Sequence, residues 1–164
     1  MTLGQVEPPP ERSPQRSVLM VCSSGGHLAQ LVALRPWYRG HRTRWVTFPT
    51  ADATSLLAGE DVVAAYHPTT RDVPNLLRNI GLALRVLRRD RPDVIVSSGA
   101  GVAVPFFVLG RLMGIPTVYL EVFDRLDSAT LTGRLCRPFT DRMLVQWDEQ
   151  QRLYRDAVVV GPVL

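Results

Sequence analysis

The sequence contains no lysine, so all 19 of its basic side chains are arginines. This absence points to a GC-rich genome more than to a function. Against 15 acidic residues the arginines still give a formal net charge of +4 and a pI of about 9.7. This excess of positive charge favours acidic partners such as phosphates, nucleotides and anionic lipid head groups.

Cysteine is scarce, since Cys22 and Cys136 are the only two in 164 residues. They lack the spacing of a metal site and are too few for a disulfide framework. We therefore expect two reduced, structural thiols, as in a cytoplasmic protein. The sequence also has no Asp-x-Asp pair to hold a metal ion, and we expect neither a metal nor a cofactor.

Long apolar runs are missing as well. The longest candidate, 102–120, is interrupted by Arg111, Gly114 and Pro116 and falls short of the roughly 18 apolar residues of a membrane span. Residues 1–16 are rich in proline and polar side chains and lack the apolar centre of a signal peptide. We expect a disordered lead over 1–16 and one domain over 17–164.

Short apolar runs alternate with helical patterns along that domain. Strands are predicted at 17–22, 43–48, 61–66, 93–97, 115–120, 142–146 and 157–160. Helices are predicted at 27–34, 51–57, 75–89, 102–113, 129–137 and 148–154. Continuous apolar strands separated by helices are typical of a parallel sheet covered on both faces. The predicted fold is therefore an α/β, Rossmann-like, doubly wound parallel sheet.

For two of the predicted helices, contact with a membrane is one of two possible interpretations. On helix 75–89 the residues expected to face the core are Leu76, Leu77, Ile80, Ala83, Leu84 and Leu87. The opposite face is arginine-rich, which most often means solvation and otherwise means contact with anionic lipids. Helix 102–113 is apolar and either packs in the core or dips into a membrane. The candidate membrane contacts are Arg78, Arg85, Arg89, Phe106, Phe107 and Arg111.

Three loops follow predicted strands at the sheet edge where doubly wound folds bind their ligands. The loops 23–27 and 97–101 are glycine turns that lead into helices, so their backbone N–H groups could hold an anion. Neither turn has the spacing of a dinucleotide fingerprint or a Walker motif. The alternative is that both are merely tight turns. Their candidate ligand-binding residues are Ser24, Gly25, Gly26, Ser98, Gly99 and Gly101.

Two ionisable side chains in these loops are candidates for catalysis. His27 follows the first turn and could act as a general base, although a histidine there is also commonly a cap or a surface residue. Glu121 begins the third loop, 121–128, and could orient a hydroxyl or act as a base. The alternative is that this loop, with Asp124 and Asp127, is only a solvated charged segment.

Several stretches occur together and in order in one known family: 23–27, 97–101 with Pro105, Glu121-Val-Phe with Arg125, 131–147, and the ending Gly161-Pro-Val. The chain resembles the membrane-associated subunit of the two-part N-acetylglucosaminyltransferase that extends dolichol-linked oligosaccharide. It is similar also to bacterial exopolysaccharide and capsule counterparts, and to the N-terminal half of the peptidoglycan lipid-intermediate glycosyltransferase. The likeness covers about 18–163, and 121–147 is its most specific part.

The resemblance implies a GT-B fold divided between two chains, of which this one is the acceptor-binding half. The partner subunit would bring the site for a UDP-linked sugar, and the acceptor would be a polyprenyl-diphosphate-linked saccharide. The complex would invert the anomeric carbon without a metal, and this chain would be inactive alone. It would sit peripherally on the cytoplasmic face of the plasma membrane and serve exopolysaccharide or capsule synthesis.

The resemblance also implies roles for individual residues. Gly25, Gly26 and His27 would face the lipid diphosphate and the attacking hydroxyl, and Glu121 would act as a base or position the acceptor. The loop with Ser98, Gly99 and Gly101 would form a second glycine turn beside them.

Two other functions remain open from the sequence. The chain could be a non-catalytic scaffold that recruits a glycosyltransferase partner to the membrane. It could also be a self-sufficient nucleotide-binding transferase, although that function needs a nucleotide fingerprint, which the sequence lacks.

Overall fold

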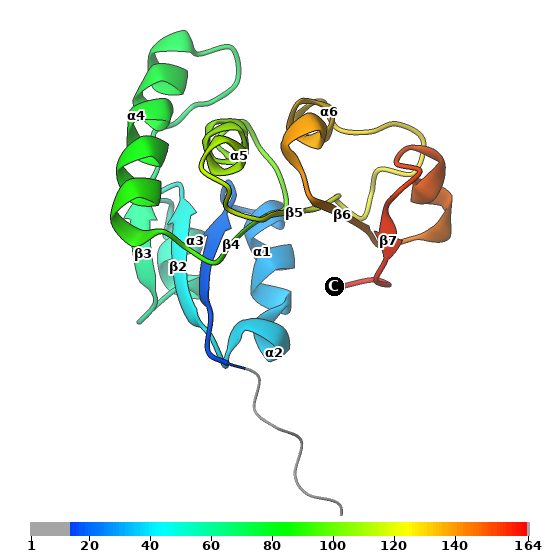
Figure 1. Cartoon of the computed structure of the whole chain (residues 1–164), viewed down its shortest axis with the longest axis horizontal. Helices are drawn as coiled ribbons and strands as arrows, with labels where there is room; N and C mark the ends of the chain where they lie inside the picture. The colour runs from blue at the N-terminus through cyan, green and yellow to red at the C-terminus, as the bar shows by residue number, and fades with distance from the viewer. Residues whose placement is uncertain (1–13, 164) are drawn as a thin grey trace, which may run out of the picture.

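The computed structural model describes residues 14–163 (Figure 1). Most of the predicted lead, 1–13, lies outside the described residues, as does Leu164. Within the described range, no helix is both long enough and apolar enough to cross a bilayer.

One seven-stranded sheet organises the chain, in the order β3-β2-β1-β4-β5-β6-β7, and all neighbouring strands are parallel. The strands are β1 (Ser17–Val21), β2 (Arg42–Thr47), β3 (Asp61–Ala64), β4 (Val94–Ser97), β5 (Thr117–Leu120), β6 (Arg142–Val145) and β7 (Val158–Val159). The order reverses between β1 and β4, which is the switch point where such sheets bind ligands. The predicted parallel, doubly wound sheet is confirmed.

Helices cover both faces of this sheet. They are α1 (Gly26–Ala33), α2 (Arg35–Tyr38), α3 (Ala51–Leu56), α4 (Val73–Asp90), α5 (Ala103–Leu112), α6 (Leu131–Cys136) and the 3₁₀ turns η1 (Arg137–Phe139) and η2 (Asp148–Arg152). Figure 1 shows α4, α5 and α6 on one side of the sheet and α1 and α2 on the other. The two sides have separate apolar cores, one under α4–α6 and one under α1–α3.

Alternation along β1 explains why there are two cores. Leu19 and Val21 point into the core under α4–α6, whereas Val18 and Met20 point into the core under α1–α3. Successive side chains of a strand face opposite sides. A central strand buried on both sides must therefore be apolar at every position, as the sequence of β1 is.

Two helical segments differ from the prediction. The helix predicted at 27–34 is α1, which ends at Ala33, and Pro36 lies in the first turn of a separate short helix, α2, that was not predicted. A proline is accepted there because the N–H groups of a first turn have no partner within the helix. The segment predicted as a helix at 148–154 is the 3₁₀ turn η2.

The orientation of α4 departs from the predicted helix face, of which only Ala83 and Leu87 are buried as expected. Its buried residues are Asn75, Asn79, Leu82, Ala83, Val86 and Leu87, while Leu76, Leu77 and Ile80 are exposed. The cause is polar, because Asn79 accepts from the N–H of Tyr66 at 3.0 Å and donates to its carbonyl oxygen at 2.9 Å. Asn75 likewise donates to the carbonyl oxygen of Pro68 at 3.0 Å. These bonds turn the two asparagines inward and leave Leu76, Leu77 and Ile80 on the outside.

Two of the candidate membrane contacts lie on helix α5 and point into the core. Phe106 and Phe107 are fully buried in the core under α4–α6. Their proposed contact with a membrane is therefore wrong, and the alternative of core packing is confirmed. Cys22 and Cys136 are also buried and unpaired, as expected for structural thiols.

Candidate functional site

The first glycine turn lies open at the carboxyl end of β1. Gly25 has a φ of +71°, which a glycine adopts without strain, and a Cβ on Gly25 or Gly26 would meet no atom within 4 Å. Within the described residues, the N–H groups of Gly26 and His27 have no acceptor. The start of α1 thus presents free donors at an open surface, as predicted.

An acidic residue that the sequence did not single out fixes this turn. The carboxylate of Asp52, in the first turn of α3, accepts from the N–H of Gly25 at 2.8 Å. The nearby Thr50 hydroxyl and the hydrogen bond from the Gly25 N–H lower the pKa of Asp52. No local pattern signals this role, because Asp52 reaches the turn only through the pairing of β1 with β2.

The two glycine turns meet through a reciprocal pair of hydrogen bonds. His27 Nδ1 lies 2.7 Å from the carbonyl oxygen of Ser98, and the Ser98 hydroxyl donates to the carbonyl oxygen of His27 at 2.8 Å. The structure thus brings together the two loops that the sequence placed at one sheet edge. Ser98 itself is fully buried, so its hydroxyl holds His27 and does not face a ligand.

The second turn is more closed than the first. Gly99 has a φ of +115° and is buried, and a Cβ there would lie 2.7 Å from the Tyr119 hydroxyl and 3.1 Å from His27 Cε1. A Cβ on Gly101 would lie 3.0 Å from Thr69 Cβ. These two glycines are required by close packing, which leaves Ala100 and Gly101 as the partly exposed part of the turn.

The contact with Ser98 determines what His27 can do chemically. A carbonyl oxygen only accepts hydrogen bonds, so the neutral imidazole carries its proton on Nδ1. The lone pair then lies on Nε2, and the ring is half-buried beside the open first turn. In this tautomer Nε2 is the nitrogen that could accept a proton, as a general base does.

Glu121 was predicted to lie in an open cleft, but its side chain is fully buried, so this prediction is wrong. Its carboxylate accepts from the Val122 N–H at 3.0 Å, from the Thr130 hydroxyl at 3.0 Å and from the Tyr154 hydroxyl. Every one of these donors belongs to the protein. Glu121 therefore holds the end of β5, the following loop and the start of α6 together, and its role as a base is withdrawn. Asp124 and Asp127 are exposed in that loop.

The surroundings of Glu121 are tightly packed. A Cβ on Gly133 would lie 2.7 Å from the Glu121 carboxylate and 2.9 Å from the Thr130 hydroxyl, and it would also meet the Tyr154 hydroxyl. Burial, with the nearby carboxylate, raises the pKa of Tyr119 and Tyr154 above the ordinary range. Both tyrosines thus remain neutral donors.

A buried chain of glutamines connects α1 with the loops after β5 and β6. Gln146 donates to Gln30 at 2.6 Å and to the Glu121 carbonyl oxygen at 3.0 Å, and it accepts from the Val163 N–H at 3.1 Å. Gln150 donates to the Val122 carbonyl oxygen at 2.8 Å. Buried amides need complete partnering, and here it fixes the last described residues beside α1.

The remaining predicted residues lie apart from the two turns. Ser24 is half-buried in the first turn, and its carbonyl oxygen accepts from Ser23. Arg78, Arg85 and Arg89 are exposed on α4, and Arg111 pairs with Asp141 at 2.7 Å. Within residues 14–163, no three acidic, histidine or cysteine side chains are grouped so that they could hold a metal ion.

Comparison with known families gives one match over more than half of the chain. Residues 65–163 match the family described as "Oligosaccharide biosynthesis protein Alg14 like". Among curated proteins, the chain is 39% identical over 77 residues to UDP-N-acetylglucosamine transferase subunit alg14 of Schizosaccharomyces pombe, covering 44% of this chain and 37% of that protein. It is 28% identical to the ALG14 subunit of Eremothecium gossypii, covering 93% of this chain and 82% of that one.

Solved structures show the same fold. Acinetobacter baumannii MurG superimposes with a TM-score of 0.71 at 21% identity, covering 91% of this chain and 46% of that one. A UDP-N-acetylglucosamine 2-epimerase from Rickettsia bellii gives a TM-score of 0.71 at 14% identity, covering 92% and 46%. The chain thus spans about half the length of these structures and has the Rossmann-like fold of a GT-B N-terminal domain.

Proposed function

The chain belongs to the Alg14-like family of oligosaccharide biosynthesis proteins, and on this premise we propose that it is the acceptor-binding subunit of a two-chain glycosyltransferase. The enzyme would transfer a sugar from a UDP-linked donor to a polyprenyl-diphosphate-linked saccharide. The relatives are named as subunits of UDP-N-acetylglucosamine transferase, which supports this donor class.

The observation that carries the proposal is the fixed tautomer of His27. Nδ1 is held by the Ser98 carbonyl oxygen at 2.7 Å, which leaves the Nε2 lone pair to take a proton. The acceptor hydroxyl loses its proton to Nε2 as its oxygen attacks the anomeric carbon. The nucleoside diphosphate leaves from the opposite side of that carbon, so the configuration inverts.

The first glycine turn supplies the acceptor side of this reaction. The free N–H groups of Gly26 and His27 lie beside the imidazole and would bind an oxygen of the acceptor. Gly25 keeps the surface open for a close approach of the ligand. Gly99 and Gly101 act by allowing the second turn to pack behind His27.

The donor half would come from another protein. A partner subunit with the UDP-sugar site would complete the cleft, and this chain alone would be inactive. Such a division is consistent with the word "subunit" in the names of its relatives.

A membrane contact is best placed on α4. Val73, Leu77, Ile80 and Leu84 lie on one face of the helix, and Val73 and Leu77 are each more than 60% exposed. Arg85 and Arg88 lie beside this apolar stripe. An exposed apolar stripe bordered by arginines suits a helix that lies on an anionic bilayer. We therefore propose that the chain attaches peripherally to a membrane through α4. The membrane would be the plasma membrane, at its cytoplasmic face, and the pathway would be exopolysaccharide or capsule synthesis.

Reconstitution tests this function. The chain would be co-purified with a partner resembling the C-terminal half of a GT-B enzyme and assayed with UDP-N-acetylglucosamine and a polyprenyl-diphosphate-linked sugar. Transfer by the pair, and by neither chain alone, is expected. Transfer by the partner alone, with this chain only raising its vesicle binding, would establish the scaffold function in place of the catalytic one.

A further inference from the structure

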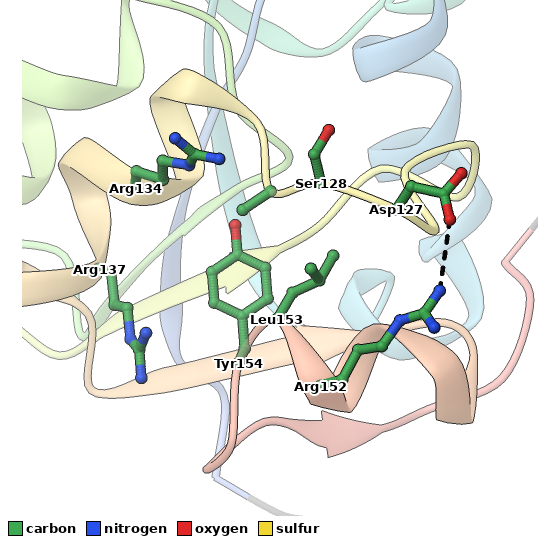
Figure 2. A pocket seen from close by; sticks show the side chains of 8 residues that line it. Asp127, Ser128, Arg134, Arg137, Arg152, Leu153 and Tyr154 are labelled. Carbon is green, nitrogen blue, oxygen red and sulfur yellow. Dashed lines mark hydrogen bonds and ion pairs between the residues drawn. The ribbon is translucent and has the colours of Figure 1, made fainter.

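A cavity of about 430 Å³ lies between the loop after β5, α6 and η2, away from the His27 turn. Its lining includes Arg134, Arg137, Arg152 and Tyr154, and Asp127 is its one acidic residue. Figure 2 shows Arg134 and Arg137 on one side of the Tyr154 ring and Arg152 on the other. The volume is that of a small-ligand site.

Two of the three arginines have no acidic partner among the described residues, and the third has only an exposed one. Within residues 14–163, the guanidinium groups of Arg134 and Arg137 have no acidic partner, and Arg137 lies 5.8 Å from the centre of the Tyr154 ring. Arg152 donates to the Leu126 carbonyl oxygen at 3.1 Å and contacts the almost fully exposed Asp127 at 3.4 Å. The cavity therefore offers guanidinium donors to an anion from outside the chain.

The wall of the cavity is rigid. Tyr154 donates its hydroxyl to the buried carboxylate of Glu121, which also accepts from Thr130 at 3.0 Å. Burial and this hydrogen bond raise the pKa of Tyr154, so the phenol stays neutral. Arg137 therefore lies at cation–π distance from a hydrogen-bonded, neutral ring.

Helix α6, which carries Arg134, also has two exposed apolar side chains. Leu131 is 73% exposed and Leu135 is 49% exposed, one helical turn apart and on either side of Arg134 in the sequence. Phosphate is a preferred partner of arginine, and an apolar ridge beside it suits a hydrocarbon chain. We propose that this cavity binds the phosphate of a lipid, with Arg134 and Arg137 as its main donors and Leu131 and Leu135 against the lipid chain.

Two lipids share this chemistry: a polyprenyl diphosphate and an anionic phospholipid. The cavity lies at the carboxyl ends of β5 and β6, the sheet edge that also carries His27. The choice of a polyprenyl diphosphate as one source rests on the proposed function. The binding itself can be measured without a partner or a transferase reaction, so a failed reconstitution would leave this test intact.

Titration calorimetry of the full chain would use farnesyl diphosphate and inorganic diphosphate as probes. Flotation would use phosphatidylcholine vesicles with and without phosphatidylglycerol. The test variant is Arg134→Gln/Arg137→Gln, and the control is Arg142→Gln/Arg155→Gln, which removes the same charge from exposed positions outside the cavity. Circular dichroism would confirm that both variants fold.

We expect at least a tenfold weaker affinity for farnesyl diphosphate, for phosphatidylglycerol vesicles or for both in the test variant, and less than a twofold change in the control. The probe that loses affinity identifies the source of the phosphate. An equal loss in both variants, or no binding by the unmodified chain, would overturn the proposal. Inorganic diphosphate binding as tightly as farnesyl diphosphate would overturn the role of Leu131 and Leu135.

Discussion

His27 and Glu121 were both candidates for the base, and their hydrogen bonds separate them. His27 has one nitrogen engaged by a backbone carbonyl and the other free beside an open turn. Glu121 has both carboxylate oxygens engaged and no exposed surface. The residue types alone could not distinguish them, because the difference lies in partners from distant parts of the chain.

Gly133 should tolerate no side chain. Its Cβ would fall within 3 Å of the Glu121 carboxylate and the Thr130 hydroxyl, in a cluster with no free space. We expect Gly133→Ala to lower the free energy of unfolding by about 1–3 kcal/mol, the usual cost of overpacking. Urea denaturation would measure this. Gly40→Ala, whose Cβ would meet nothing within 4 Å, is the control, and an equal effect of both changes would contradict the packing argument.

The two buried thiols should make stability fall in alkaline solution. Burial raises the pKa of Cys22 and Cys136 from 9.0 to about 12. The protonated thiols therefore contribute fully to the free energy of unfolding below pH 9. This contribution is lost as the pH rises from 9 toward 12, because only the unfolded chain releases these protons in that range. Between pH 8 and 10 each thiol should account for a loss of about 1.4 kcal/mol.

Urea unfolding of the unmodified chain and of Cys22→Ser/Cys136→Ser at pH 8 and pH 10 would measure this loss. The double variant should lose markedly less stability over that interval. Parallel pH profiles of the two proteins would contradict the assignment of the effect to the thiols.

At the scale of elements, periodicity was enough for the strands but not for the orientation of α4. The strand patterns identified all seven strands to within a few residues. The signal is strongest for the central strands β1 and β4, because a strand buried on both faces is apolar throughout. The helix wheel wrongly put Leu76, Leu77 and Ile80 inward, because it counts apolar residues and takes no account of hydrogen bonds. Asn75 and Asn79 are buried because their amides bind the backbone of the loop before α4. That pairing depends on tertiary contacts.

Asn79 should therefore be more important for stability than its exposed neighbours. Asn79→Ala leaves the N–H and carbonyl oxygen of Tyr66 without their partner, and each unsatisfied group costs about 1–3 kcal/mol when it is buried. Because these groups are only partly buried, we expect a loss of about 2 kcal/mol in thermal or urea unfolding. Arg85→Ala on the exposed face should stay within about 0.5 kcal/mol. Equal effects would refute the proposed cause of the helix orientation.

The apolar stripe of α4 should bind membranes without contributing to the core. Leu77→Glu/Ile80→Glu is expected to abolish flotation with phosphatidylglycerol vesicles while the melting temperature changes little, because both side chains are exposed. The control is Leu56→Glu on α3, which lies on the other side of the sheet and is also exposed. Vesicle binding that survives in the α4 variant would place the membrane contact elsewhere.

At the scale of the whole molecule, the chain is a single sheet with its candidate site at an open edge. The two glycine turns could be placed together from the sequence, because the carboxyl ends of parallel strands share an edge. The contributions of Asp52, Gln146 and Tyr154 could not, since each acts on a loop far away in the sequence. The open site is consistent with the proposed division of the enzyme between two chains.

The central claim is that this half supplies the base. Its most direct test is the turnover of His27→Ala in the assembled two-chain complex, with His41→Ala, before β2 at the other end of the sheet, as the control. We predict at least a hundredfold loss of turnover for His27→Ala, the lower range for removal of a general base. Partner binding should not change, and His41→Ala should retain activity. A loss of less than tenfold for His27→Ala in an intact complex would contradict the account.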